Sequence, residues 1–561
     1  MGTRRQNIHQ VHYLEGDILS TVAYSTGNHA RVGRPVAILL GGRRRVPLPS
    51  SENCDTMGAG ELPKSLGPRR PNLPEKRGSG PKNEISRKTP MPNSTMHLPP
   101  RTVVHWCVYL LIAAATVETW FVAGLGVPCR VTGGSMAKTL LGVHRNATCG
   151  DCGHRFPCGT DQPLTRSWAV CPNCGFVAND LTTLPNVEGD RLLIDRSAFS
   201  VRSPRRWEIV ALRRPRRSNE IAVKRVVGLP GESIEIRGGD VYIDGNIQRK
   251  SLAEQHALSI LVHNADEQPR LEPTPPPRWR GQSRQSRWSS IEGGFTHPVG
   301  PENEPVDWLT YHHGLRPAGK GGKVRPSPVT DILGYDLSRP RREEDVCAVA
   351  DLMLSFRLTD RSGRGDFLLR ATDGGIQFKI QMQFEGEKPR YLQYQVYRGG
   401  QPVPGGSGNK IVATDEQLVE VSLIDQQLLL ALGGRTVVAR PYRRPEPPPS
   451  PVSSPLAIGV RGLGVTVRHL RVYRDVYYTR PAEWRIRPGG GQSVHLASDE
   501  YYVLGDNSPI SADSRNWPDG GTIGHKSFVG KPLVAIPTLQ VSPAGRWRFQ
   551  VPNPAGIRYI R

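Results

Sequence analysis

The chain has 561 residues, too long for one ordinary domain, and a formal net charge of +23. It contains 60 glycines and 51 prolines, and only 37% of its residues are hydrophobic. This composition excludes a single compact globule and a membrane protein with many spans, and it favours small β-rich domains joined by linkers rich in proline and arginine. By itself, the basic excess is typical of chains that bind nucleic acid or anionic lipid.

Residues 1–101 show no sustained apolar periodicity, and their second half is rich in proline, lysine and arginine. We predict that this basic N-terminal region is disordered. Between residues 61 and 101, nine lysines and arginines stand against three glutamates. The arm can be interpreted as a contact for nucleic acid or lipid, as a solvated tail, or as an upstream extension that is not translated. Met91 and Met96 are alternative starts.

An apolar run extends from Val103 to Ala123, and His105 and Glu118 are its only residues that titrate near or below neutral pH. At 1.5 Å per residue, such a helix covers roughly 30 Å, one bilayer core. We predict an uncleaved transmembrane anchor over 102–124, with a cleaved signal peptide or a buried core helix as alternatives. Because positive charge precedes the run, the N-terminus is expected in the cytoplasm and everything after residue 124 on the other side of the membrane.

The chain after the apolar run is predicted to be mainly β. Residues 127–250 contain short β-like segments separated by turn signals, and residues 479–561 are expected to complete the same domain. Residues 251–345 read as a polar connector rich in proline and arginine. Residues 346–478 alternate between apolar and polar positions in many short segments, which predicts an inserted β-sandwich. The strand rhythm of this insertion loosely resembles concanavalin-like and laminin-G-like sandwiches.

Five of the nine cysteines lie within 26 residues, which indicates a local site rather than a chain-wide disulfide framework. Two Cys-x2-Cys pairs separated by 18 residues have the spacing of a zinc ribbon over 149–174. The predicted zinc ligands are Cys149, Cys152, Cys171 and Cys174. Disulfides, which an external location permits, and metal-free reduced thiols are the alternatives. Cys158 and His154 are expected to be spectators inside the loop, with the replacement of one ligand by either of them as the alternative.

Two further segments carry groups suited to nucleophilic catalysis. Gly133 and Gly134 precede Ser135, so the backbone can approach a substrate closely and present the hydroxyl. A serine needs a base, and Lys224 shares one face of a predicted strand with Ala222 and Val226, which are small and apolar. Desolvation there lowers a lysine pKa toward the range that suits a general base at neutral pH.

In their order along the chain, these motifs resemble type I signal peptidase, the membrane-bound Ser/Lys endopeptidase that removes signal peptides from exported proteins. The resemblance is carried by the apolar run and by residues 133–140, 189–195, 222–236 and 504–515. It implies that Ser135 is the nucleophile and Lys224 the general base. In the last motif it implies that Ser511 orients the lysine. It also implies that the charged pair Asp513 and Arg515 braces the site and that Asp506 and Asn507 begin the motif's turn.

The sequence departs from the family's motif at two positions. Gly133 stands where some members carry a serine that donates to the oxyanion, so the Ser135 backbone N–H and another donor would take that role. Lys138 stands where the motif has proline, which adds a charge near the site. The residues that the resemblance assigns to the chemistry are all present, so we expect an active enzyme.

The expected function is the cleavage of signal peptides from exported pre-proteins, at the surface of the inner membrane and in contact with its lipid. No cofactor is needed for this chemistry, zinc would be structural, and no nucleic-acid partner is expected. One alternative is a membrane-anchored protein whose sandwich binds glycan or protein and whose peptidase core is a relic. Another is a self-cleaving Ser/Lys repressor, which would need a DNA-binding domain and no membrane span.

Overall fold

The fold is mainly β, as predicted, with three α-helices among the described residues. The computed structural model describes residues 100–119, 124–160, 167–272, 274–316, 323–336, 345–384, 391–411, 416–445, 450–479, 493–517, 521–541 and 549–560. The predicted disordered region of 1–101 lies outside these ranges except for its last two residues. The chain divides into two compact units near residue 115, and every element after residue 124 belongs to one of them.

Helix α1 (Pro100–Val117) contains most of the apolar run. Its large apolar side chains are exposed, and Leu111 reaches 70%. Within the described ranges, no helix is long and apolar enough to cross a membrane. The predicted anchor over 102–124 is therefore not found as a spanning helix, and its residues 120–123 lie outside the described ranges.

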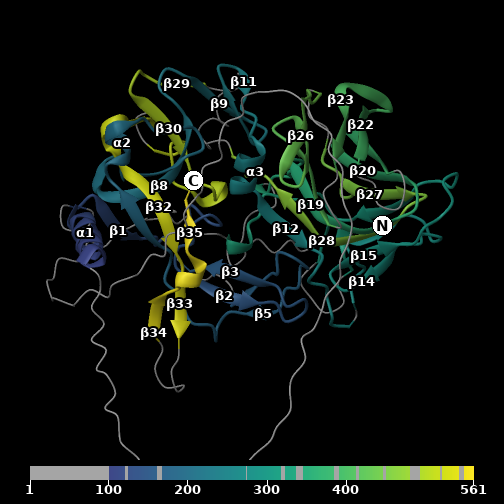
Figure 1. Ribbon diagram of the computed structural model, residues 1–561, viewed down its shortest axis with the longest axis horizontal. Helices are drawn as coiled ribbons and strands as arrows, with labels where there is room; N and C mark the ends of the chain where they lie inside the picture. The colour runs from purple at the N-terminus through teal and green to yellow at the C-terminus, as the bar shows by residue number, and fades with distance from the viewer. Residues whose placement is uncertain are drawn as a thin grey trace, which may run out of the picture. The chain divides into compact units, whose positions relative to one another are not determined.

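The first domain is built from both ends of the described chain, because strands from its two sequence segments alternate in one eight-stranded sheet (Figure 1). Early strands β7 and β8 lie beside late strands β32 and β30. A four-stranded sheet shares this interleaving, since β29 pairs with β9. The first sheet has the order β1 (Gly126–Arg130), β6 (Arg191–Asp195), β32 (Phe528–Ile536), β7 (Ile209–Arg214), β8 (Arg217–Gly228), β30 (Glu500–Leu504) and β31 (Ile523–Gly524), with β35 (Arg558–Tyr559) on β32. The second has the order β11 (Asn246–Ile247), β10 (Asp240–Ile243), β9 (Ser233–Arg237) and β29 (Val494–His495).

Strand burial explains why these segments form sheets. In β9 the burial alternates along the strand, with Ile234 and Ile236 almost completely buried, as expected of a sheet with one face on a core. Strand β8 is instead buried on both faces around Ala222–Val227. Lys224 therefore lies in the interior, with the apolar Ala222 and Val226 on the same face of the strand. Pairing with β7 and β30 on its two edges fixes the register of β8.

Two antiparallel sheets form a sandwich around a shared core. The rings of Phe356 and Phe367, one from each sheet, pack with centroids 5.8 Å apart. One sheet has the order β14 (Ser289–Ile291), β15 (Gly294–His297), β28 (Gly464–Arg474), β19 (Leu352–Ser362), β24 (Gln417–Ile424), β25 (Gln427–Leu432) and β26 (Arg435–Pro441), with β12 (Ile260–Asn264) on β28. The other has the order β13 (Trp279–Gly281), β16 (Asp307–Tyr311), β27 (Leu456–Arg461), β20 (Gly365–Asp373), β21 (Ile376–Phe384), β22 (Tyr391–Arg398) and β23 (Gln401–Ile411).

The prediction of a connector over 251–345 is wrong for most of that range. Residues 252–258 form helix α3 (Leu252–Leu258), which a capping box begins at Ser251. Strands β12 to β16 follow, and they complete both sheets of the sandwich rather than link to it. The sequence did not indicate these strands because they have only three to five residues each. They also stand among residues rich in proline and arginine, so no run of alternating positions marks them. The sandwich therefore begins near residue 260.

Smaller elements complete the described structure. Helix α2 (Ala198–Val201) packs beside β32. The remaining strands form two-stranded ladders, namely β2 (His144–Thr148) with β3 (Arg155–Gly159), β4 (Trp168–Ala169) with β5 (Asn179–Asp180), β17 (Gly314–Leu315) with β18 (Arg325–Pro326), and β33 (Thr538–Val541) with β34 (Phe549–Pro552).

A buried ionic cluster joins the sandwich to the first domain. The ammonium of Lys250 lies 2.6 Å from a carboxylate oxygen of Asp425 and 2.8 Å from one of Asp475. All three side chains are almost completely buried. Arg444 pairs with three further carboxylates, those of Asp240, Asp351 and Asp373. Since Asp240 belongs to β10 of the first domain and the other carboxylates to the sandwich, this cluster ties the two together.

Candidate active site

Ser135 lies on a tight turn between β1 and β2, within residues 133–140, which we call the nucleophile loop. The N–H of Ala137 donates to the carbonyl of Gly134 (3.0 Å), and that of Leu140 to Met136 (2.8 Å). The side chains of Met136, Ala137 and Leu140 are buried, so apolar packing holds the loop from below. Ser135 itself is 6% exposed.

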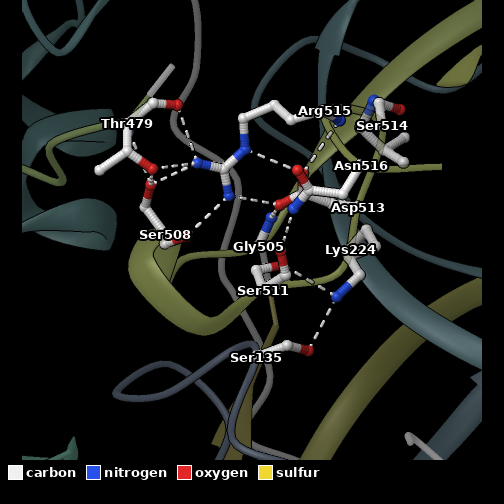
Figure 2. A network of polar contacts seen from close by, with 11 residues as sticks. Ser135, Lys224, Thr479, Gly505, Ser508, Ser511, Asp513, Ser514, Arg515 and Asn516 are labelled. Atoms are coloured by element: carbon white, nitrogen blue, oxygen red, sulfur yellow. Dashed lines mark hydrogen bonds and ion pairs between the residues drawn. The ribbon is translucent and has the colours of Figure 1, made fainter. Parts of the chain in front are cut away.

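The structure brings Lys224 of β8 to this serine. Its Nζ donates to Ser135 Oγ at 2.8 Å and to Ser511 Oγ at 3.1 Å, as Figure 2 shows. Lys224 is 1% exposed, so water does not compete for the ammonium. Two serine hydroxyls thus hold the nitrogen in place on the strand, with one of them on the loop that the resemblance assigns to the nucleophile.

Burial lowers the pKa of Lys224 from 10.5 to about 8. The carboxylate of Asp513 acts in the opposite direction, and the guanidinium of Arg515 lowers the pKa further. At neutral pH, about a tenth of such a lysine is unprotonated and able to accept a proton, a far larger fraction than for an exposed lysine.

Asp513 and Arg515 form a buried pair behind the lysine (Figure 2). Two guanidinium nitrogens of Arg515 donate to the two carboxylate oxygens of Asp513, at 2.9 and 2.8 Å. Asp513 also accepts from the N–H of Gly505 at 2.9 Å. Burial raises the pKa of Asp513, but the guanidinium of Arg515 outweighs it and the pKa lies below its usual value. Arg515 in turn donates to Ser508 and Thr479, which closes the network around this pair.

The start of the last motif holds the nucleophile loop from its other side. The N–H of Asn507 donates to the carbonyl of Ser135 at 3.0 Å, and its side-chain nitrogen to that of Gly134 at 3.1 Å. Asp506 receives two hydrogen bonds from Arg225, at 2.8 and 2.6 Å, and one from Thr139 of the loop. All of the predicted residues of the dyad and its support therefore meet at one site.

Several residues of this site were not predicted. Arg225 forms a buried ion pair with Asp506. It directly follows Lys224 in the motif of residues 222–236, so that motif could have indicated a role for it. Lys138, noted only as a departure, lies near Asp506, and burial lowers its pKa to about 8. Tyr335 also packs against Gly134 of the nucleophile loop, and Asp336 accepts a hydrogen bond from Asn507. They lie about 200 residues after Ser135, in the range predicted to be a connector, and no feature of the sequence indicated a role in the site.

The four cysteines predicted as zinc ligands lie together, with their sulfur atoms within 4.8 Å of one another. The sulfurs of Cys149 and Cys174 are 3.6 Å apart and those of Cys152 and Cys171 3.7 Å apart. These separations are far too long for disulfides, whose sulfurs are about 2.05 Å apart. They fit the edges of a tetrahedron with metal–sulfur bonds of about 2.3 Å, about 3.8 Å each. The cluster could therefore hold a metal ion.

The turns that carry these cysteines have the same backbone geometry. The N–H of Gly153 donates to the carbonyl of Cys149 at 3.0 Å, and that of Gly175 to Cys171 at 2.9 Å. Both glycines have φ near +77°, a region that other residues rarely adopt. Cys158 is completely buried nearby, and burial raises its pKa to about 12, so it stays a neutral thiol. His154 instead pairs with Glu267.

Residues 179–279 match the family model for signal peptidase, peptidase S26. This range contains Lys224 but neither Ser135 nor Ser511. The chain is 40% identical over 70 residues to signal peptidase I of Leptolyngbya laminosa, covering 11% of this chain and 34% of the relative. It is 33% identical over 76 residues to signal peptidase I V of Bacillus subtilis, covering 13% and 42%. The chain spans about a third of the length of the curated relatives that it matches.

Solved structures similar to this chain include a β-glucanase of Bacillus licheniformis, at 9% identity and a TM-score of 0.22 over 35% of this chain and 92% of that one. The carbohydrate-binding module CBM66 of Bacillus subtilis matches at 9% identity and a TM-score of 0.20, over 34% and 93%. The resemblance of the insertion to concanavalin-like and laminin-G-like sandwiches stays a prediction.

Proposed function

We propose that this chain is a serine endopeptidase of the type I signal peptidase kind, which cleaves signal peptides from exported pre-proteins. The observation that carries the proposal is the hydrogen bond of 2.8 Å from Lys224 Nζ to Ser135 Oγ in an interior that lowers the lysine pKa to about 8. The partial matches to signal peptidases support it from the sequence side.

In the proposed reaction, neutral Lys224 takes the proton of the Ser135 hydroxyl as its Oγ attacks the carbonyl carbon of the scissile peptide bond. The Ser135 backbone N–H is suited to donate to the oxyanion that forms. The Lys224 ammonium then protonates the leaving amine, and the mature protein departs. Lys224 next removes a proton from water, whose oxygen attacks the acyl carbon, and the bond to Ser135 Oγ breaks. The Lys224 ammonium returns the proton to Ser135 Oγ and the signal peptide is released. Ser511 keeps the lysine nitrogen aimed at Ser135 throughout.

The proposed site of action is the outer surface of the inner membrane, with residues 102–124 as a single anchor, the N-terminus in the cytoplasm and lipid as a contact. The exposed apolar side chains of α1 and the positive charge before it support this placement. Substrate signal peptides have an apolar segment of their own, so an enzyme held at the bilayer would meet them there.

We also propose that the cysteine cluster is a structural zinc site of the ribbon type. Cys149, Cys152, Cys171 and Cys174 would hold the ion, and their sulfur separations fit tetrahedral thiolate coordination. Bound zinc would cross-link the two turns and supply no chemistry to the peptidase reaction, which uses the serine and lysine alone.

The test of the peptidase proposal is the cleavage of a pre-protein in detergent or lipid vesicles. Ser135→Ala and Lys224→Ala should each abolish cleavage while the protein still folds. Ser289→Ala and Lys526→Ala, at exposed positions away from the site, are matched controls and should retain it. Cleavage at the normal rate by either dyad variant would contradict the proposal.

A further inference from the structure

A short turn from the sandwich insertion reaches the nucleophile loop. It is the 3-10 turn Gly334–Asp336, which lies before β19 in the chain. Tyr335 and Asp336 are 3% and 4% exposed. We propose that these two are positioning residues for Ser135, so that the sandwich insertion forms part of the active site. This inference rests on the proposed peptidase function.

The ring of Tyr335 packs directly against the residue before the nucleophile. A Cβ atom added to Gly134 would lie 2.4 Å from a ring carbon of Tyr335, and one added to Gly159 only 2.2 Å from it. The backbone of Gly134 is outside the left-handed region, so its conformation would accept a side chain. The ring of Tyr335 is therefore the main reason that this position requires glycine, and it forms a wall for the nucleophile loop.

Three hydrogen bonds extend this contact. The hydroxyl of Tyr335 donates to the carbonyl of Val143 at 3.0 Å, just beyond the loop's end. The side-chain nitrogen of Asn507 donates to Asp336 and to the carbonyl of Gly134, each at 3.1 Å. Asp336 thus fixes the amide that holds the nucleophile loop, and Tyr335 fixes the loop's packing.

The sandwich holds this turn firmly. Arg474, buried at the end of β28, donates to the carbonyls of Asp331 at 2.8 Å and Ile332 at 3.3 Å. The N–H of Asp331 donates to the carbonyl of Cys347, close to the start of β19. The residues just before the turn are thus attached to the end of β28 and to the segment that precedes β19. A displacement of these strand ends would be transmitted to Tyr335 and from there to Ser135.

The geometry of a dyad tolerates little displacement, because an error of about 1 Å in a reacting group can cost 100-fold in rate. A positioning role therefore predicts that Tyr335 and Gly134 are coupled in catalysis. Gly134→Ala should lower kcat by about 10- to 100-fold at nearly unchanged KM, since the new methyl group would displace the loop. Tyr335→Ala should lower kcat more mildly, and Tyr335→Phe, which keeps the ring but loses the hydrogen bond to Val143, should lower kcat less than Tyr335→Ala.

The decisive experiment is a double-mutant cycle in pre-protein cleavage. The variant Gly134→Ala/Tyr335→Ala should have a higher kcat than Gly134→Ala alone, because removal of the ring makes room for the methyl group. Gly159→Ala should be rescued by Tyr335→Ala in the same way. Gly524→Ala is the control, since its added Cβ would meet only an atom 3.8 Å away, and it should leave kcat unchanged.

A double variant with a kcat at or below the product of the two single effects would overturn the positioning role, as would a normal kcat for Tyr335→Ala. If Tyr335→Ala does not fold, Tyr335→Leu takes its place in the same cycle. Failure of the inference is distinguishable from failure of the peptidase proposal. In the first case Ser135→Ala is inactive and the cycle is additive, whereas in the second Ser135→Ala still cleaves.

Discussion

Lys224 Nζ lies 2.8 Å from Ser135 Oγ, although 89 residues separate the two in sequence. The lysine is on β8, whose register is fixed by pairing with β7 and β30. The serine is on a loop whose apolar side chains are buried beneath it. The distance between the two atoms therefore depends on how β8 packs against the nucleophile loop. The protonation state of Lys224 decides whether this contact can activate the serine, and the pH dependence of cleavage measures it.

Cleavage should rise with pH. Only neutral Lys224 can act as the base, and its pKa of about 8 lies below the ordinary lysine value. We therefore expect kcat/KM to rise with pH, to reach half of its maximum near pH 8 and to level off at higher pH, because kcat/KM reports the free enzyme. A rate profile with a midpoint near 10.4, the value of an exposed lysine, would contradict the burial argument.

The charge of Arg214 provides a second test that the pH dependence of cleavage reports Lys224. Arg214 contributes to lowering the pKa of Lys224 through its positive charge. Arg214→Gln should therefore move the midpoint of kcat/KM to higher pH and leave its plateau nearly unchanged. A midpoint that stays in place or falls would show that the profile reports a group other than Lys224.

Ser511→Ala should slow cleavage without abolishing it. This serine accepts a hydrogen bond of 3.1 Å from Lys224 and so restricts the ammonium to one direction. Its loss should lower kcat by about 10- to 100-fold with a small change in KM. Ser514→Ala is the matched control, because Ser514 accepts from the N–H of Val503 and should affect stability alone. Equal kcat values for the two variants would remove the orienting role.

The ionic cluster between the domains should be essential for stability. Lys250→Met leaves the buried carboxylates of Asp425 and Asp475 without their cation, so the free energy of unfolding should fall by about 3–5 kcal/mol. Arg357→Met breaks the half-exposed pair with Glu416 and should cost about 1 kcal/mol or less. Denaturant unfolding measures both. Similar losses for the two variants would mean that the buried cluster adds nothing special.

Much of this fold was predictable because alternation is a local property. Strands β6 and β9 lie within the range 127–250, where short β-like segments were predicted, and β22 lies within the predicted sandwich of 346–478. The strands between 260 and 311 were missed because they are short and stand among residues rich in proline and arginine, so no run of alternating apolar and polar positions marks them. Their pairing depends on partners such as β27 and β28, more than a hundred residues later.

The site shows the same division. Ser135, Lys224 and Ser511 lie within motifs, and the structure brings them together. The contacts of Tyr335 depend on the shape of the ring against Gly134 and Gly159, which only the packed structure contains. A tyrosine among polar residues rich in proline and arginine carries no local sign of that contact.

Removal of one cysteine ligand should remove the metal. We expect one zinc ion per chain by metal analysis, and Cys171→Ser should lose it together with part of the stability of the surrounding turns. Cys158→Ala is the matched control, because this buried thiol lies beside the cluster but outside its four ligands, and it should retain the ion. Unchanged zinc content in Cys171→Ser would contradict the site. Thiol titration of the unfolded, unreduced protein gives an independent check, since disulfides would hide four thiols that a zinc site releases.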